Sequence, residues 1–433
     1  MNNRILIITY YWPPSGGSGV QRWLKFAKYL PEFGLLPFVL TVKNPTYPFM
    51  DESLSEDVPE EATVETSFSL EPFALFGFLT GKSAKEVGSP VTGLQGEGQS
   101  LLTRISQWVR ANLFIPDARR GWVPFSRRKA LRMINQFNIG TVVTTGPPHS
   151  VHFIGHYVQK KTGIRWIADF RDPWVDVHYN LYLPRMRWAT RLDRRYERRI
   201  LQAADEAIVV SNTMADQFRK LVDRPYHVIT NGYDPQDFPG EPVVLEEAFT
   251  VRYVGKLGET VIPYGLIKAL SQVESDIPFQ IEFIGNVHEK LPELVKSHGL
   301  ENRVIFKPYM PMKQANHELC KAHILLLILP DTPGNELILS GKLFNYIGAG
   351  RPIVMIGPTE GDAARIIKEY DFGECFNHDD SDSLKQWFEQ KLSDFASRGD
   401  KATPGTHAHS SPEQFSRREL TGKLTKLIQP KGQ

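Results

Sequence analysis

Ser340, Gly341 and Lys342 are, by residue type, well suited to hold a phosphate group. Serine is a common helix cap, and the residues that follow have the apolar spacing of a short helix that Gly348 and Pro352 would end. A helix N-terminus presents unpaired N–H groups and about half a positive charge. Gly341 would let a ligand approach the backbone and Lys342 would add a full charge, so the segment predicts a phosphate site. An ordinary helix cap in an α/β domain is the alternative.

A second glycine–lysine pair, Gly255 and Lys256, follows the strand expected at 249–254. Glycine permits close approach to the backbone, and Lys256 could neutralise a diphosphate. Alone, the pair would be interpreted as an exposed loop lysine. Together with the helix start, it predicts two contacts to one diphosphate at the same sheet edge. Glu336 and Asn345 flank the helix start and could bind hydroxyl groups of a sugar or ribose.

Further candidates follow two strands in the first half of the chain. His149 lies in a loop after the strand expected at 140–145, where it could exchange a proton with an acceptor hydroxyl or bind it. Asp169, Arg171 and Asp172 end the next strand. Two acids around an arginine just outside a sheet are costly unless they pair or do chemistry. A substrate-binding role therefore competes with a plain structural ion pair.

The loop that contains Gly16, Gly17 and Gly19 follows the first strand, but it does not match a dinucleotide-binding motif. Arg22 occupies the position of the third glycine, and no acid ends the second strand. The segment 334–342 is not a Walker loop, because its glycines are too far apart and no serine or threonine follows its lysine. These spacings argue against an oxidoreductase and against a nucleoside triphosphatase.

Alternating strand and helix patterns position these candidates. Buried strand patterns are expected at 4–9, 36–42, 140–145, 164–169, 206–210, 227–230, 249–254, 279–284, 304–307, 324–329 and 353–356. Helical spacing occurs between many of them. Because open parallel sheets bind ligands at the carboxyl ends of their strands, the pattern brings the candidates to ligand-binding edges. We expect an α/β protein with two doubly wound, Rossmann-like domains that face each other across a cleft.

Turn-forming residues at 231–240 mark the boundary between the two domains. We expect the first domain over 1–236, with a variable, irregular insertion at 45–100, and the second over 237–411. An apolar stripe predicts a helix within 412–433.

The composition is that of an ordinary globular protein, with 433 residues, 41% hydrophobic and 23% charged. Its two cysteines do not suggest a disulfide framework or a metal site. The longest apolar run, 324–329, is far too short for a membrane span. We therefore expect a cytoplasmic protein, either free or bound peripherally at the inner membrane face.

The net charge of +2 hides a strongly basic block. Residues 101–200 contain 19 Lys and Arg against 6 Asp and Glu, a local net charge of +13. Segment 100–135 could contact an anionic membrane through its basic and aromatic residues. For 191–199 we expect ordinary pairing along a helix, because Asp193 and Glu197 stand at pairing distances from arginines. No nucleic-acid-binding module is present, so nucleic acid is not an expected partner.

The order of these motifs resembles that of family 4 glycosyltransferases, which have the GT-B fold, and is most similar to the branch associated with bacterial surface and capsular polysaccharides. The resemblance spans nearly the whole chain. It is carried by the segments 10–17, 169–174, 210–212, 229–234, 254–256, 341–346 and 348–352.

The resemblance implies transfer of a sugar from a nucleoside diphosphate sugar to a glycan or polyprenyl-linked acceptor, with retention of anomeric configuration and no metal or other cofactor. The donor would bind the second domain, the acceptor would bind the first, and the final helix would cross back to the first domain. The residues expected to act fall into three groups: catalytic His149, Asp172 and Lys256; donor-binding Gly16, Gly17, Gly255, Lys256, Glu336, Ser340, Gly341, Lys342 and Asn345; and acceptor-binding Asp169, Arg171 and Asp172.

Two other functions fit the same architecture. Asn345 stands where the family commonly has a glutamate, which motivates a non-catalytic protein that binds a nucleotide sugar or acts as a scaffold. A sugar-nucleotide epimerase on the same two-domain plan is the third hypothesis, and it predicts turnover without any acceptor.

Overall fold

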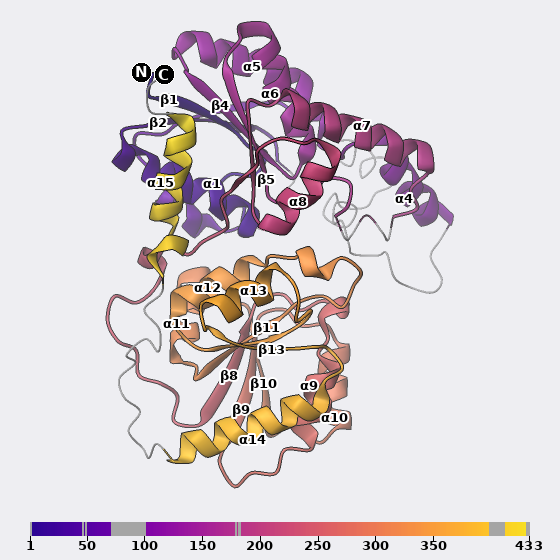
Figure 1. Ribbon diagram of the computed structural model, residues 1–433, viewed down its shortest axis with the longest axis vertical. Coiled ribbons are helices and arrows are strands. Elements are labelled where there is room, and N and C mark those ends of the chain that lie inside the picture. The colour runs from indigo at the N-terminus through magenta and orange to yellow at the C-terminus, as the bar shows by residue number, and fades with distance from the viewer. Residues whose placement is uncertain are drawn as a thin grey trace. The chain divides into compact units, whose positions relative to one another are not determined.

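The computed structural model describes residues 2–45, 47, 50–70, 101–177, 180, 183–397 and 412–429, and for residues 18, 101–103 and 106 only the backbone. The chain divides into two compact units, Met1–Thr230 with Arg417–Gln433, and Asn231–Ser416 (Figure 1). The C-terminal segment therefore returns to the first unit.

The first unit is built on a parallel sheet in the strand order β3-β2-β1-β4-β5-β6-β7. Its strands are β1 (Arg4–Ile8), β2 (Leu36–Val42), β3 (Thr63–Ser67), β4 (Thr141–Gly146), β5 (Arg165–Phe170), β6 (Glu206–Val209) and β7 (His227–Val228). Strand β1 is central and its apolar residues are buried on both faces, as expected of a strand covered by helices on each side. The strand order reverses between β1 and β4, which is where such sheets bind ligands.

The helices of the first unit cover this sheet. They are α1 (Ser18–Tyr29), α4 (Leu101–Leu113), α5 (Val123–Gln136), α6 (His152–Thr162), α7 (Arg187–Ala203), α8 (Asn212–Leu221) and α15 (Arg417–Ile428). The C-terminal helix α15 contacts α1, with Leu420 and Leu424 buried, which confirms the predicted return of the chain. None of the described helices is long and apolar enough to cross a lipid bilayer.

The second unit repeats the same plan. Its parallel sheet has the order β10-β9-β8-β11-β12-β13, with β8 (Phe249–Val254), β9 (Phe279–Ile284), β10 (Val304–Lys307), β11 (Ile324–Ile328), β12 (Ile353–Ile356) and β13 (Gly373–Phe376). Its helices are α9 (Tyr264–Ser271), α10 (Lys290–Ser297), α11 (Met312–Lys321), α12 (Gly341–Ala349), α13 (Asp362–Glu369) and α14 (Ser381–Ser397). Separate apolar clusters fill the two faces of the sheet. The strand order reverses between β8 and β11.

The structure confirms the predicted α/β class and departs from the expected elements in three places. Strands β3 and β13 extend the sheets, although the sequence did not predict them; both are edge strands and lack a continuous buried run. The basic segment 100–136, whose pattern is helical, forms two helices, α4 and α5, separated by a loop at Pro116. The C-terminal helix begins at Arg417, because Phe415 before it lies in the core of the second unit. Residues 71–100 of the expected insertion lie outside the described residues.

Candidate functional site

Helix α12 begins where the sequence predicts a phosphate site. The Ser340 hydroxyl accepts a hydrogen bond from the backbone N–H of Lys342 at 3.3 Å, which confirms the predicted cap. The helix ends at Gly350, which has the left-handed backbone conformation typical of a glycine stop. Because α12 follows β11, its N-terminus lies at the carboxyl end of the sheet, beside the reversal of strand order.

The side chain of Lys342 reaches from α12 to the loop after β8. Its Nζ hydrogen-bonds the hydroxyl of Tyr253, lies 3.4 Å from the carbonyl oxygen of Lys256 and sits 4.1 Å from the centre of the Tyr253 ring. A Cβ atom at Gly255 would lie only 2.6 Å from Cε of Lys342. Gly255 therefore leaves the space that the Lys342 side chain occupies, and the structure brings the two glycine–lysine motifs together.

The Lys342 ammonium has no negative partner in the part of the chain that the structure describes. Burial alone lowers its pKa from 10.5 to about 8. Its contacts are neutral oxygens and an aromatic ring, which stabilise a cation less than a carboxylate would. A half-buried cation beside a helix N-terminus is a suitable partner for an anion.

Two tyrosines that sequence reasoning overlooked hold this arrangement. The Tyr346 hydroxyl donates to the carbonyl of Leu326 at 3.1 Å and accepts from the N–H of Val254 at 3.1 Å, so it ties α12 to both strands at the reversal point. The Tyr253 hydroxyl donates to the Lys256 carbonyl at 2.9 Å. In the sequence, Tyr346 was notable only as a member of the 341–346 motif. Tyr253 was notable only as a residue of an expected strand.

The other predicted donor-binding residues lie at the same edge of the second sheet and differ in their exposure. Lys256 has an exposed side chain in the loop that Lys342 contacts. Asn345 lies one turn into α12 and is half-buried, and Glu336 is exposed on the short helix η8 (Asn335–Leu337). The backbone of Glu336 packs against Gly361, where a Cβ atom would lie 2.8 Å from its carbonyl oxygen. The structure thus groups Gly255, Lys256, Gly341 and Lys342, and places Glu336 on a neighbouring loop.

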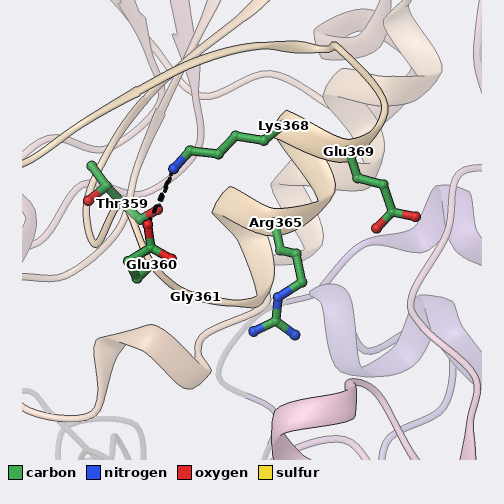
Figure 2. A pocket seen from close by; sticks show the side chains of 6 residues that line it. All are labelled: Thr359, Glu360, Gly361, Arg365, Lys368 and Glu369. Carbon is green, nitrogen blue, oxygen red and sulfur yellow. Dashed lines mark hydrogen bonds and ion pairs between the residues drawn. The ribbon is translucent and has the colours of Figure 1, made fainter.

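A shallow pocket of about 310 Å³ lies farther along this edge, at the start of α13 (Figure 2). It is lined by Thr359, Glu360, Gly361, Arg365, Lys368 and Glu369. Lys368 donates to the Thr359 carbonyl at 2.9 Å and lies 3.6 Å from Glu360, and Arg365 pairs with Asp362. Its cations already have partners, so it suits a diphosphate less well than the Lys342 region does.

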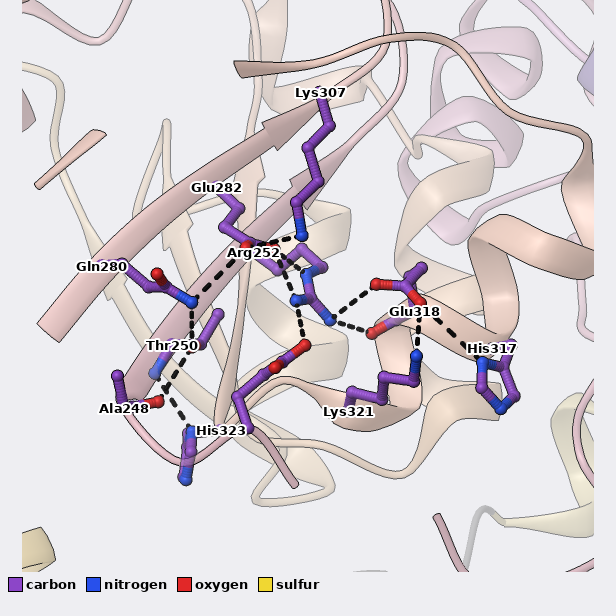
Figure 3. Close-up of polar contacts among 11 residues, drawn as sticks. Ala248, Thr250, Arg252, Gln280, Glu282, Lys307, His317, Glu318, Lys321 and His323 are labelled. Carbon is purple, nitrogen blue, oxygen red and sulfur yellow. Dashed lines mark hydrogen bonds and ion pairs between the residues drawn. The ribbon is translucent and has the colours of Figure 1, made fainter. Parts of the chain in front are cut away.

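The largest charge cluster of the second unit is structural. Arg252, fully buried in β8, pairs with Glu282 of β9 at 2.5 Å and with Glu246 at 2.7 Å, and it also donates to the Glu318 carbonyl (Figure 3). Lys307 completes the pairing of Glu282. These charges satisfy one another. The described residues contain no group of three or more His, Cys, Asp or Glu side chains that could hold a metal ion.

In the first unit, Arg171 links the two loops at the reversal point. Its Nε donates to the Gly146 carbonyl at 3.1 Å, and its guanidinium also donates to the carbonyl of Pro147. A Cβ atom at Gly19, in the first turn of α1, would collide with the guanidinium. Burial lowers the pKa of Arg171, and the half-buried Asp172 opposes this effect.

The glycine loop after β1 places the N-terminus of α1 at this edge. Gly17 precedes α1 with a φ of 98°, a conformation that other residues rarely adopt. Gly16 is half-buried and Gly17 is exposed, with no atom near the position that a Cβ atom at Gly17 would occupy. A ligand can therefore approach the backbone of this loop closely.

Asp169 is committed to the fold. It is fully buried and receives hydrogen bonds from Arg22 at 2.9 Å, from Trp23 at 2.7 Å and from Thr145 at 2.8 Å. Burial raises the pKa of Asp169, but Arg22, Trp23 and Thr145 together hold it below its usual value. Its oxygens hold α1 against β4 and β5.

His149 is buried in an aromatic setting after β4. Its ring stacks on Trp174 with centroids 4.8 Å apart and an angle of 6° between the planes. Burial, His152 and Arg171 lower the pKa of His149 well below 6.5, while the nearby Pro173 carbonyl opposes them. The imidazole is therefore neutral near pH 7 and is better suited to hydrogen-bond a hydroxyl than to act as a strong base.

Asp117 positions the turn that carries His149, and the sequence gave no signal for it. Its carboxylate accepts hydrogen bonds from the backbone N–H and the hydroxyl of Ser150, both at 2.8 Å. Gly146 leaves room for the two imidazole rings, because a Cβ atom there would lie 2.8 Å from ring nitrogens of both His149 and His152.

Comparisons with known proteins agree with this geometry. A family model described as "Glycosyltransferase Family 4" matches residues 91–237. This match and the two parallel α/β sheets identify the protein as a glycosyltransferase with the GT-B fold, and residues 91–237 are similar to family 4. Among curated proteins, none matches the chain.

Solved structures share the fold along nearly the whole chain. Sucrose-phosphate synthase from Thermosynechococcus elongatus has a TM-score of 0.64 at 14% identity, with 99% of this chain and 98% of that chain covered. Anabaena Alr3699/HepE in complex with UDP and glucose has a TM-score of 0.61 at 14% identity, with 98% and 99% covered.

A putative UDP-N-acetylglucosamine 2-epimerase from Listeria monocytogenes has a TM-score of 0.56 at 9% identity, with 99% of this chain and 96% of that chain covered. Sequence identities this low show a shared fold only. The fold by itself does not distinguish a sugar transferase from an epimerase.

Proposed function

We propose that this glycosyltransferase moves a sugar, with retention of anomeric configuration and without a required metal, from a nucleoside diphosphate sugar to a glycan or polyprenyl-linked acceptor. The donor binds the second unit and the acceptor binds the first. A uridine diphosphate sugar is the first donor class to test, because the Anabaena structure of the same fold holds UDP. We place the reaction in the cytoplasm, in the assembly of a cell-surface or capsular polysaccharide.

The single observation that carries this proposal is the half-buried Lys342 ammonium. Its partners among the described residues are the Tyr253 hydroxyl and ring and the Lys256 carbonyl, none of them a carboxylate, and it lies at the N-terminus of α12 beside the loop of Gly255 and Lys256. A diphosphate would supply the missing negative charge. The backbone N–H groups near Gly341 and the exposed side chain of Lys256 complete a cationic binding site for it.

The reaction breaks the bond between the anomeric carbon and the diphosphate, and the leaving group departs with the electron pair. The acceptor oxygen bonds to the same carbon, and its proton leaves with the diphosphate or solvent. Negative charge grows on the leaving group as the bond breaks. Fixed positive groups aimed at that charge are the largest source of rate, which assigns Lys342, Lys256 and the start of α12 to leaving-group stabilisation.

The first unit contributes the acceptor side. His149, neutral and buried, hydrogen-bonds an acceptor or donor hydroxyl, and Asp172 orients the acceptor. Arg171 and the Gly16–Gly17 loop approach the ligand from the neighbouring strand. Glu336, Ser340 and Asn345 shape the donor side. Asp169 has a positioning role in this proposal, because its oxygens are occupied by Arg22, Trp23 and Thr145.

Removing the two lysines tests the proposal. Lys342→Ala and Lys256→Ala should each lower the transfer rate about 10²- to 10³-fold, the loss typical of one removed charge-stabilising donor. Lys268→Ala, at an exposed position of α9, is the matched control and should transfer normally. UDP affinity is measured by calorimetry. The rate of sugar transfer is measured with each member of a panel of lipid-linked acceptors. Near-normal turnover in both lysine variants would refute the proposed site.

The non-catalytic alternative rests on Asn345. A scaffold would bind nucleotide sugars in calorimetry but release no UDP with any acceptor, and Asn345→Glu would then create activity. An epimerase would convert the donor sugar in the absence of an acceptor. Release of UDP that depends on an acceptor and on Lys342 would exclude both.

A further inference from the structure

One face of α7 carries charge that the described residues do not neutralise. Arg187, Arg191, Arg195, Arg198 and Arg199 all have exposed side chains. With about 3.6 residues per turn, these positions fall within roughly one third of the helix circumference. None of the five makes an ion pair with any described residue.

The acidic residues of α7 lie on its opposite, buried side. Asp193 accepts from Arg185 at 2.5 Å and from Trp174 at 2.7 Å. Glu197 pairs with Arg194 at 2.7 Å, and burial raises the pKa of Glu197 to about 7. The sequence spacing predicted that these acids would pair along the helix. That prediction holds for Arg194 and is wrong for the exposed arginines.

Exposed apolar residues adjoin this cationic stripe. Trp188 lies among the arginines of α7 and is 45% exposed, and Trp108 of α4 is 40% exposed. Asn112 links the two helices: its amide donates to the carbonyl of Trp108 at 2.9 Å, and its side-chain oxygen accepts from the N–H of Met186 at 2.6 Å. Figure 1 shows α4 beside one end of α7, in agreement with their contact.

We propose that this surface, the α4–α7 face, binds an anionic lipid bilayer. It comprises Arg104, Ile105, Trp108, Leu113, Met186, Arg187, Trp188, Arg191, Arg195, Arg198 and Arg199. Arginines are attracted to an anionic leaflet, and tryptophan is favoured at the boundary between lipid headgroups and acyl chains. A soluble polyanion would satisfy the arginines but would leave the exposed Ile, Leu and Met side chains in water. The combination therefore favours a lipid surface.

This location differs from segment 100–135, whose basic and aromatic residues were expected to contact the membrane. Arg119 stacks over Tyr10 and Arg127 over Tyr157, at 5.0 and 4.9 Å from the ring centres. Arg120 lies over Phe153 and donates to the Ile115 carbonyl. These three side chains contact groups within the first unit. We therefore assign the membrane-binding surface to α7 and not to α5.

Vesicle binding of the full chain tests the face. The triple variant Arg191→Gln/Arg195→Gln/Arg198→Gln should bind vesicles of phosphatidylglycerol and phosphatidylcholine about 10²-fold more weakly, since each arginine near an anionic surface contributes about 1 kcal/mol. The control Arg128→Gln/Arg132→Gln/Lys160→Gln removes the same charge from exposed positions of α5 and α6 and should bind normally. Co-sedimentation is measured without sugar donor, so the result does not depend on the proposed activity.

A second variant separates lipid from other polyanions. Trp108→Ser/Trp188→Ser should lose the part of vesicle binding that survives high salt, while its affinity for soluble heparin stays unchanged. Thermal unfolding verifies that each variant is folded. Equal loss in both charge triples, normal vesicle binding of the α7 triple, or heparin binding tighter than vesicle binding would each overturn the proposal.

Discussion

Lys342 is a half-buried cation whose free energy depends on what occupies the space beside it. Below about pH 8 its ammonium is charged both in the fold and in the unfolded chain, and its burial opposes folding. Because its pKa is lower in the fold, folding stability rises between about pH 8 and 10.5 as the folded protein loses this proton first. The fold thus keeps a destabilising charge at the position where a diphosphate would stabilise it.

This charge predicts how donor binding depends on pH. UDP affinity should fall as pH rises through about 8, since the neutral amine attracts the diphosphate less. The phosphates of UDP are already fully ionised there. Lys342→Arg keeps its charge at all these pH values, so its affinity should stay flat. Calorimetry from about pH 7 to about pH 9 measures both. An equal fall in the arginine variant would assign the titration to another group.

At the scale of elements, the strand-end loops determine where chemistry can occur. In the first unit the loop after β4 positions His149 through Asp117, Ser150 and the space above Gly146. In the second unit Tyr346 fixes α12 against β8 and β11. These contacts join residues far apart in the chain. Local periodicity therefore predicted the loops, but not the groups that position their side chains.

Gly146→Ala tests whether the β4 loop positions His149. The added methyl group would lie 2.8 Å from ring nitrogens of His149 and His152 and should displace both rings. A displacement of about 1 Å can lower a rate about 10²-fold, so transfer should fall by that order while UDP affinity stays normal. Gly258→Ala, at a position with open space, is the control. Unchanged transfer would show that His149 has no part in the reaction.

At the scale of the whole molecule, the same strand order, 3-2-1-4-5-6, appears in both units, with one further edge strand in the first. In each unit the candidate groups gather where that order reverses. The chain also ends in the unit in which it began, because α15 packs on α1. Stability of the first unit therefore depends on the last helix of the sequence.

Leu424→Ala measures that dependence. Leu424, a residue of α15, is fully buried, and truncating it should lower the free energy of unfolding of the first unit by about 2–5 kcal/mol. The exposed neighbour Lys423→Ala should change it by less than about 0.5 kcal/mol. Hydrogen exchange of α1 amides should accelerate only in the leucine variant. Unchanged exchange there would mean that α15 does not support α1.

The sequence by itself determined the strands other than the edge strands β3 and β13, the turns and the cap of α12, because buried runs such as 5–8 and a serine–glycine helix start are local patterns. It also predicted Gly255, Lys256 and Lys342 as neighbours, from strand ends that must meet at one edge. Only the tertiary structure decided which side chains are already occupied. Asp169 is held by Arg22, far away in the chain, whereas the exposed arginines of α7 face away from the buried Asp193. Burial and pairing depend on which faces the sheet order brings together, and a linear pattern does not contain that information.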